Sequence, residues 1–287
     1  MLASFLAAQY HHRFTVDPIR AAPAVAVLMA LGIALAIGRS TARPRLAAGA
    51  RAFLQMTLFT VLGVVLAYAL AANAGPLWDA RLAAADRAIG FNWPAARAIL
   101  DTCPPAIWLL GLAYHSLTVQ MIVIIVALSS TSKFEILRTM VFAAIMSGFV
   151  TILISGFTPA MGNLFDPSGY VHLWPSIAWL EQGLISGLRD GSLRVLDLTM
   201  LMGIVSFPSF HATLAAIFVW AFGAVPRLAL PGRAWAILTV VATPIFGGHY
   251  GVDVIMGLLL APPAIIAGRR ITRRKQVSRL MDSALPA

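Results

Sequence analysis

Seven long apolar runs divide this chain, and they restrict its fold more than any other feature of the sequence. They cover residues 21–38, 53–74, 106–128, 136–157, 212–225, 234–246 and 252–267. A helix that crosses a bilayer needs about 20 apolar residues, with a range of roughly 17–25. The runs at 212–225 and 234–246 reach this length only if their helices continue into the adjoining residues. We therefore predict an all-α integral membrane protein, a bundle of seven transmembrane helices, or six if one run is re-entrant.

The composition agrees with a single membrane domain. Hydrophobic residues make up 60% and charged residues 11% of the 287 residues, whereas a soluble domain carries about 25% charged residues. The single cysteine, Cys103, excludes an internal disulfide and a cysteine metal site. Within this domain we expect a lead-in at 1–20, four spans in 21–157, an outer capping loop at 158–209, a catalytic hairpin and last span at 210–268, and a basic tail at 269–287.

The basic residues predict how the chain crosses the membrane, because loops rich in lysine and arginine stay in the cytoplasm. If the N-terminus is outside, 14 of the 21 basic residues fall on the cytoplasmic side. These 14 are Arg39, Arg43, Arg45, Arg51, Lys133, Arg138, Arg227, Arg233, Arg269, Arg270, Arg273, Arg274, Lys275 and Arg279. We therefore expect a cytoplasmic C-terminus in a cell inner membrane. The net charge of +10 then reflects topology, and no nucleic-acid partner is predicted.

Two connecting segments on the outer side are long enough to form structure of their own. Residues 75–105 hold Trp78 and Trp93 together with Asp79 and Asp86, which favours short amphipathic helices at the interface. Such a segment forms either a structural belt or a lid. Residues 158–207 form the longest polar region, and a loop of this length in a compact protein is usually functional or disordered. We expect it to cap the site.

Two histidines and an aspartate fall at one end of a predicted helical hairpin. His211 and Pro226 lie about 22 Å apart along a helix, and Arg233 and His249 lie about 24 Å apart, at a rise of ~1.5 Å per residue. Because the two legs match, the chain returns to the level that it left. His249 and Asp253 are four residues apart and share one helix face if the helix starts near Gly248. An aspartate there can accept the Nδ1 proton of the imidazole and leave Nε2 free.

Residues 207–212 (FPSFHA) and 247–254 (GGHYGVDV) resemble the second and third signature motifs of the type-2 phosphatidic acid phosphatase superfamily. The closest resemblance is to its inositol-phosphotransferase-like branch, which includes inositol phosphorylceramide synthases. Residues 86–94 (DRAIGFNWP) and 187–191 (GLRDG) are similar to bacterial members of that branch. The resemblance extends from about residue 76 to residue 268.

This resemblance implies an enzyme that acts on a phospholipid or lipid-linked phosphate without a cofactor. His249 would attack phosphorus and form a phosphohistidine, Asp253 would orient it, and His211 would protonate the leaving alkoxide. Backbone amides and the Ser209 hydroxyl at a helix N-terminus can hold phosphate oxygens. Gly248 would let the backbone come close to the ligand. Both transfer to an alcohol and hydrolysis remain open, since one phosphohistidine serves both.

The chain departs from the superfamily pattern where that pattern supplies positive charge. Typical members carry an upstream Lys-x6-Arg-Pro motif and an arginine shortly before the last histidine, and both are absent here. The charge of a phosphate transition state still needs donors. Arg189 and Arg194 in the capping loop are the predicted substitutes. The alternative is that they form loop salt bridges with Asp190 and Asp197.

Three other interpretations are weaker. His211, His249 and Asp253 could supply three zinc ligands, but the resemblance implies chemistry without a metal. A Ser209–His249–Asp253 triad lacks the Gly-x-Ser-x-Gly elbow of such hydrolases. A lipid transporter or scaffold without chemistry is the rival of another class. Of the polar residues in the run at 106–128, Tyr114, His115 and Gln120 either reach toward the site or pack against a neighbouring helix by hydrogen bonding, and packing is favoured. Tyr250 is expected at the membrane interface.

Overall fold

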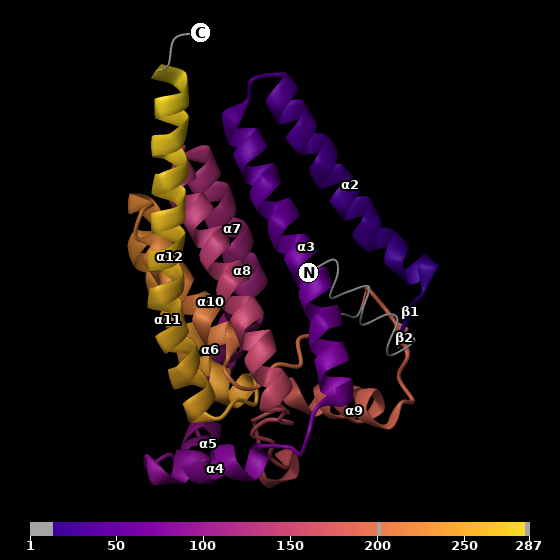
Figure 1. The fold of residues 1–287 in the computed structure, drawn as a ribbon. Coiled ribbons are helices and arrows are strands. Elements are labelled where there is room, and N and C mark those ends of the chain that lie inside the picture. Colours follow the sequence, from indigo (N-terminus) through magenta and orange to yellow (C-terminus); the bar gives the residue numbers. More distant parts are fainter. Residues whose placement is uncertain (1–13, 200–201, 285–287) are drawn as a thin grey trace.

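The computed structural model describes residues 14–199 and 202–284, and Figure 1 shows a bundle of long helices with shorter helices across one end. The long helices are α2 (Pro18–Ser40), α3 (Pro44–Asn73), α8 (Phe134–Phe157), α11 (Pro226–Phe246) and α12 (Gly251–Ala284). The shorter elements are α4 (Asp79–Ala88), α5 (Trp93–Asp101), α6 (Pro104–His115), α7 (Leu117–Ser130), η1 (Pro167–Gly169), α9 (Ala178–Asp190) and α10 (Phe210–Phe222). The prediction of an all-α integral membrane protein is confirmed.

The seven predicted runs all form helices, but they do not all span a membrane by length. Five helices in the described part of the chain are long and apolar enough to cross alone. α6 and α7 make a sixth span if they count together, although they bend by 56° at their junction. α10 has only 13 residues, about 20 Å of helix. The alternative of six spans therefore agrees better with the structure than the favoured prediction of seven.

α10 lies at the centre of the bundle. Its buried face packs among α7, α8, α11 and α12, in a cluster that includes Ile217, Phe218 and Phe222. α2 lies at the edge and packs on α3, where Gly38 approaches Ala47 closely enough that a Cβ atom would come within 2.7 Å of its backbone nitrogen. Most of the apolar side chains of α2 are exposed, as expected for a helix that faces lipid.

The short helices α4, α5 and α9 lie across the end of the bundle that is opposite the C-terminus (Figure 1). The turn that joins α2 to α3 lies at the other end, on the side of the C-terminus. The helix starts that carry the predicted site belong to the end covered by α4, because α12 begins there and contacts α4. This arrangement agrees with interfacial helices over the predicted site.

A two-stranded parallel sheet, which the sequence did not predict, ties the start of the chain to the capping loop. β1 (Thr15–Val16) pairs with β2 (Val195–Leu196), and Arg20 forms an ion pair with Asp197 at 2.7 Å. Of the predicted lead-in at 1–20, residues 1–13 lie outside the described part. At the other end, α12 continues to Ala284, so the predicted basic tail begins as a helix, and residues 285–287 lie outside the described part.

Candidate active site

The three predicted catalytic residues come together where two helices begin. His211 is the second residue of α10, His249 lies in the turn between α11 and α12, and Asp253 lies in the first turn of α12. The ring centroids of His211 and His249 are 6.3 Å apart. Asp253 is fully buried and His249 is 5% exposed, whereas His211 is partly exposed. A small group could therefore reach both imidazoles from the side of His211.

The hydrogen-bond partners of His249 determine which ring nitrogen carries the proton. Its Nδ1 lies 3.0 Å from the carbonyl oxygen of Ser206 and 3.4 Å from Oδ2 of Asp253. A carbonyl oxygen and a carboxylate oxygen can only accept hydrogen bonds. Nδ1 must therefore be the donor, and Nε2 of the neutral imidazole keeps its lone pair. This arrangement leaves Nε2 able to act as a nucleophile.

Asp253 is held in place by several donors. Its Oδ2 accepts from the hydroxyl of Ser206 at 2.9 Å and from the backbone amide of Tyr250 at 2.9 Å. Its backbone carbonyl accepts from the amide of Ser209 at 2.9 Å. These donors fix the position of the buried Asp253 carboxyl through Oδ2, and Oδ1 is buried without a hydrogen-bond partner in the described part of the chain. The same bonds join the start of α10 to the start of α12.

Tyr114 contacts His211 directly, so for this residue the structure agrees with the alternative of a reach toward the site and not with the favoured packing role. The two rings stack with centroids 4.8 Å apart and an interplanar angle of 17°. Tyr114 is buried, and His115 meets it edge-on at 5.2 Å. The expected packing role is seen instead at Gln120, whose Nε2 donates to Thr239 Oγ1 at 2.8 Å. A single polar aromatic within an apolar run was the only signal for Tyr114.

Ser209 and Gly248 occupy the positions that the motif predicts for phosphate contact. Ser209 is the N-cap of α10, and its Oγ accepts from the amide of Ala212 at 3.3 Å. Gly248 has φ +69, and a Cβ atom there would lie 2.5 Å from Cβ of Ala178. Only glycine fits both the left-handed backbone and this space. The carbonyl oxygen of Gly248 accepts from the amide of Asn163 at 2.6 Å, which ties the capping loop to the turn.

Comparison with known proteins identifies the family of the chain. A family model described as the PAP2 superfamily matches residues 80–267. The chain belongs to the PAP2 superfamily. No curated protein and no solved structure matches it. The matched range runs from α4 to α12 and contains the two histidines and Asp253. Membership indicates a phosphatase-type enzyme of the membrane whose substrates are lipid phosphates.

The two arginines that we predicted as substitutes for the superfamily's basic motifs have different surroundings. Arg189 of α9 donates to the carbonyl oxygens of Ala74 at 3.3 Å and Gly75 at 3.0 Å. Arg194 donates to the carbonyl oxygens of Leu188 and Leu193, at 3.0 and 2.9 Å, and lies over the ring of Phe14. None of these contacts involves the histidines. The alternative pairing with Asp197 is wrong for Arg194, because Arg20 occupies that carboxylate.

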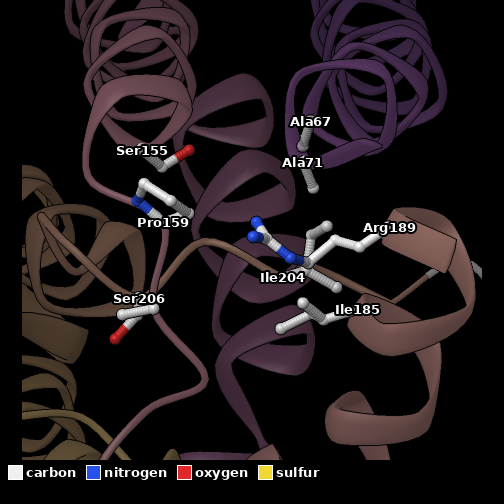
Figure 2. A pocket seen from close by; sticks show the side chains of 9 residues that line it. Ala67, Ala71, Ser155, Pro159, Ile185, Arg189, Ile204 and Ser206 are labelled. Carbon is white, nitrogen blue, oxygen red and sulfur yellow. The ribbon is translucent and has the colours of Figure 1, made fainter. Parts of the chain in front are cut away.

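A small pocket in this superfamily member is lined by Arg189 and by Ser206. It lies between α3, α8, α9 and the segment that leads to α10, and its lining includes Ser155, Arg189 and Ser206. Figure 2 shows the guanidinium of Arg189 reaching from α9 into this space, with Ser206 across from it. The Ser206 hydroxyl binds Asp253. Arg189 and the serine that binds Asp253 therefore border the same pocket.

Tyr250, expected at the membrane interface, is instead buried beside the site. Its hydroxyl donates to Oδ1 of Asp79 at 3.1 Å and lies 3.2 Å from the carbonyl oxygen of Gly162. Burial, together with the carboxylate of Asp79, raises the pKa of Tyr250 above its usual range. The correction has a physical reason. α4 lies over the turn, and its partly exposed Asp79 supplies an acceptor for the phenol, which the sequence could not indicate.

Arg97 is a further buried group near the turn that the sequence analysis did not single out. It is 4% exposed, donates to the carbonyl oxygen of Asn163 at 3.0 Å and lies over the ring of Phe165 at 4.4 Å. Through Asn163 it supports the same loop that binds Gly248. Within the described ranges, no three His, Cys, Asp or Glu side chains form a group suited to a metal ion. Chemistry without a cofactor stays a prediction.

Proposed function

We propose that this protein transfers a phosphate-containing headgroup from a phospholipid or lipid-linked phosphate to an acceptor hydroxyl, through a phosphohistidine on His249. The observation that supports this most is the Nδ1 of His249, whose two partners are both acceptors. The proton is thus held on Nδ1 and the lone pair on Nε2. A nucleophile prepared in this way splits one difficult displacement into two easier steps.

In the first step, Nε2 of His249 forms a bond to phosphorus while the bond from phosphorus to the leaving oxygen breaks. Protonated His211 gives its proton to that oxygen, so a neutral lipid alcohol leaves. Asp253 stabilises the cationic imidazole that results. In the second step, neutral His211 accepts the proton of the incoming hydroxyl, whose oxygen bonds to phosphorus as the P–N bond breaks. Histidine suits this exchange because its usual pKa of about 6.5 lies near working pH.

The phosphate oxygens need donors during both steps. The start of α10 offers free backbone amides and the Ser209 hydroxyl, and Gly248 lets its backbone approach the ligand. Arg189 and Arg194 are the proposed sources of positive charge, with Arg189 favoured because it lines the pocket that Ser206 also lines. The Arg189 guanidinium is bound to the backbone carbonyls of Ala74 and Gly75.

Transfer and hydrolysis differ only in the acceptor. The resemblance to the inositol-phosphotransferase-like branch favours transfer to a lipid alcohol or sugar, and the absence of the superfamily's basic motifs weakens the case for a simple phosphomonoesterase. Hydrolysis of a lipid phosphate or polyprenyl pyrophosphate is the second candidate, because it is the activity that the wider superfamily suggests.

We place the active site at the outer face of the membrane, which is periplasmic in a cell with two membranes, and the C-terminus in the cytoplasm. The two-to-one bias of lysine and arginine toward the opposite side supports this orientation. Substrate and membrane lipid would then meet the site from the outer leaflet.

The test is an assay of the purified protein in detergent micelles. The substrates are phosphatidic acid, a polyprenyl pyrophosphate and phosphatidylinositol, each without and with a diacylglycerol or ceramide acceptor, and His249→Ala is assayed alongside. We expect acceptor-dependent product that the variant does not form. Phosphate release without any acceptor would support hydrolysis instead. Product formation that survives in His249→Ala, or no product in any condition, would contradict the proposal and favour a transporter or scaffold.

A further inference from the structure

α4 carries two aspartates that both bind the chain around His249. Asp86 is 1% exposed and accepts three hydrogen bonds. Its Oδ1 accepts from the amide of Val252 at 2.8 Å, and its Oδ2 accepts from the amide of Gly251 at 2.8 Å. The indole of Trp93 also donates to Oδ2, at 2.5 Å. The carboxylate therefore spans the first two residues of α12 from a different helix.

The start of α12 needs such an acceptor. The first four amides of a helix have no partner within it, and the helix dipole places partial positive charge there. An aspartate side chain usually satisfies these amides from the N-cap position. The residue before Gly251 is Tyr250, which has no carboxylate and whose own amide is bound by Asp253. Asp86 thus caps α12 from outside, and its charge is balanced by amides and the dipole.

Asp79 holds the residue next to His249. Its Oδ1 accepts from the hydroxyl of Tyr250 at 3.1 Å, and its two oxygens accept from the amides of Met161 and Gly162 at 3.0 Å each. Asp79 and Asp86 are seven residues apart, so they share one face of α4. One helix face therefore holds the two residues that follow His249, Tyr250 through Asp79 and Gly251 through Asp86.

The segment that follows α4 closes over the same turn. A Cβ atom on Gly251 would overlap the ring of Phe91, and Phe91 stacks on Trp93 with centroids 5.0 Å apart. The backbone of α12 can come this close only because residue 251 is glycine. The start of α12 is therefore held by two kinds of contact. Asp86 binds its amides, and Phe91, which stacks on Trp93, packs against Gly251.

We propose that Asp86 and Asp79 are positioning residues of the active site, which hold the start of α12 so that Asp253 meets Nδ1 of His249. Asp253 is two residues after Gly251, so a shift of the helix start moves its carboxylate directly. The His249 Nδ1 to Asp253 Oδ2 separation is already 3.4 Å, and a further displacement would break the contact. The inference deepens the proposed function and rests on it for its kinetic consequences.

Asp86→Asn tests the inference with Asp101→Asn as the matched control. Asp101 also accepts three loop amides at 2.8 Å, from Val171, His172 and Leu173, but these do not adjoin His249. For product formation from the lipid substrate that His249 processes, we expect Asp86→Asn to lower kcat by up to about 100-fold with KM within about twofold. Asp101→Asn should keep kcat within about twofold. Equal effects in the two variants would overturn the inference.

A double-mutant cycle separates positioning from simple destabilisation. If Asp86 acts through Asp253, Asp86→Asn should cause no further loss of kcat in a protein that already carries Asp253→Asn. Losses that multiply would show an independent role and contradict the inference. Should Asp86→Asn fail to fold, Trp93→Phe removes the indole donor to Asp86 and keeps one aromatic ring beside Phe91, and the same cycle is run with that variant.

Amide hydrogen exchange tests the contact without using activity. The amides of Gly251 and Val252 should exchange faster in Asp86→Asn than in the wild type, and should not change in Asp101→Asn. Unchanged exchange at both amides would overturn the inference. If the wild-type protein is inactive toward every lipid while exchange changes as expected, the proposed function fails and the contact between α4 and α12 stands.

Discussion

The imidazole of His211 stacks on the phenol ring of Tyr114, with ring centroids 4.8 Å apart and an interplanar angle of 17°. The two residues belong to α10 and α6, which are far apart in the chain. The Tyr114 hydroxyl also lies 2.8 Å from where a Cβ atom of Gly247 would be. Tyr114 therefore lies beside both histidine-bearing segments. Its flat ring restricts the rotation of His211, which orients the proposed acid and base.

Replacement of Tyr114 should separate ring packing from hydrogen bonding. Tyr114→Phe keeps the stacked ring, so its kcat should stay within about threefold of the wild type. Tyr114→Leu removes the ring and frees His211 to rotate, and kcat should fall by about 10- to 100-fold because a misplaced group loses its alignment. Steady-state kinetics on the active lipid substrate measure both. A loss in Tyr114→Phe as large as that in Tyr114→Leu would indicate a role of the hydroxyl instead.

Asp253→Asn should remove most of the activity without unfolding the protein. The asparagine amide cannot hold the Nδ1 proton of His249 as a carboxylate does, nor stabilise the cationic imidazole. We expect kcat to fall by roughly 10²–10⁴-fold, the range for a group that acts in proton transfer. Asp166→Asn is the control, since Asp166 binds only the nearby amide of Ser168. Full activity of Asp253→Asn would exclude the proposed role.

Gly248→Ala should damage both stability and activity. A side chain at φ +69 is strained, by about 1–3 kcal/mol, and its Cβ would press against Ala178. We expect a lower thermal midpoint and a loss of activity through displaced His249. Gly183→Ala is the control, because nothing lies within 4 Å of a Cβ there and the residue is in α9. That change should be neutral or slightly stabilising. Equal midpoints for the two variants would count against the strain argument.

Arg189→Gln and Arg194→Gln should differ. Arg189 lines the pocket beside Ser206, whereas Arg194 is engaged with carbonyl groups and with Phe14. If Arg189 meets the substrate phosphate, Arg189→Gln should reduce kcat/KM by about 10²-fold, the effect of losing one donor to developing charge. Arg194→Gln should mainly lower the thermal midpoint. The reverse order of effects on kcat/KM would move the phosphate site toward Arg194.

Glu181 of α9 should make stability depend on pH. Burial raises the pKa of its carboxyl from 4.5 to about 8. The folded protein therefore binds more protons than the unfolded chain between these values, and stability decreases as pH rises from about 4.5 to 8. Thermal midpoints of wild type and Glu181→Gln, measured across that range, should converge at the acid end, and the variant should be relatively more stable at the alkaline end. Parallel curves would contradict the raised pKa.

The sequence by itself determined the class of fold and the identity of the proposed catalytic residues. Apolar runs near the thickness of a bilayer leave few structures other than helices, because backbone groups in lipid must bond within their own segment. The contact of His249 with Asp253 joins residues four apart, although α12 begins only at Gly251 and His249 lies in the turn before it, not on the predicted helix face. These are local relations, so they can be read along the chain.

Only the tertiary structure decided which other side chains complete the site. Tyr114 meets His211, Asp86 caps α12, and Tyr250 is buried under α4. The helices of this bundle are apolar on nearly every face, so their pattern does not indicate which side of α6 turns toward α10. Likewise, a carboxylate that binds amides 165 residues away depends on how α4 folds across the bundle end. Packing fixes that arrangement, and no local rule predicts it.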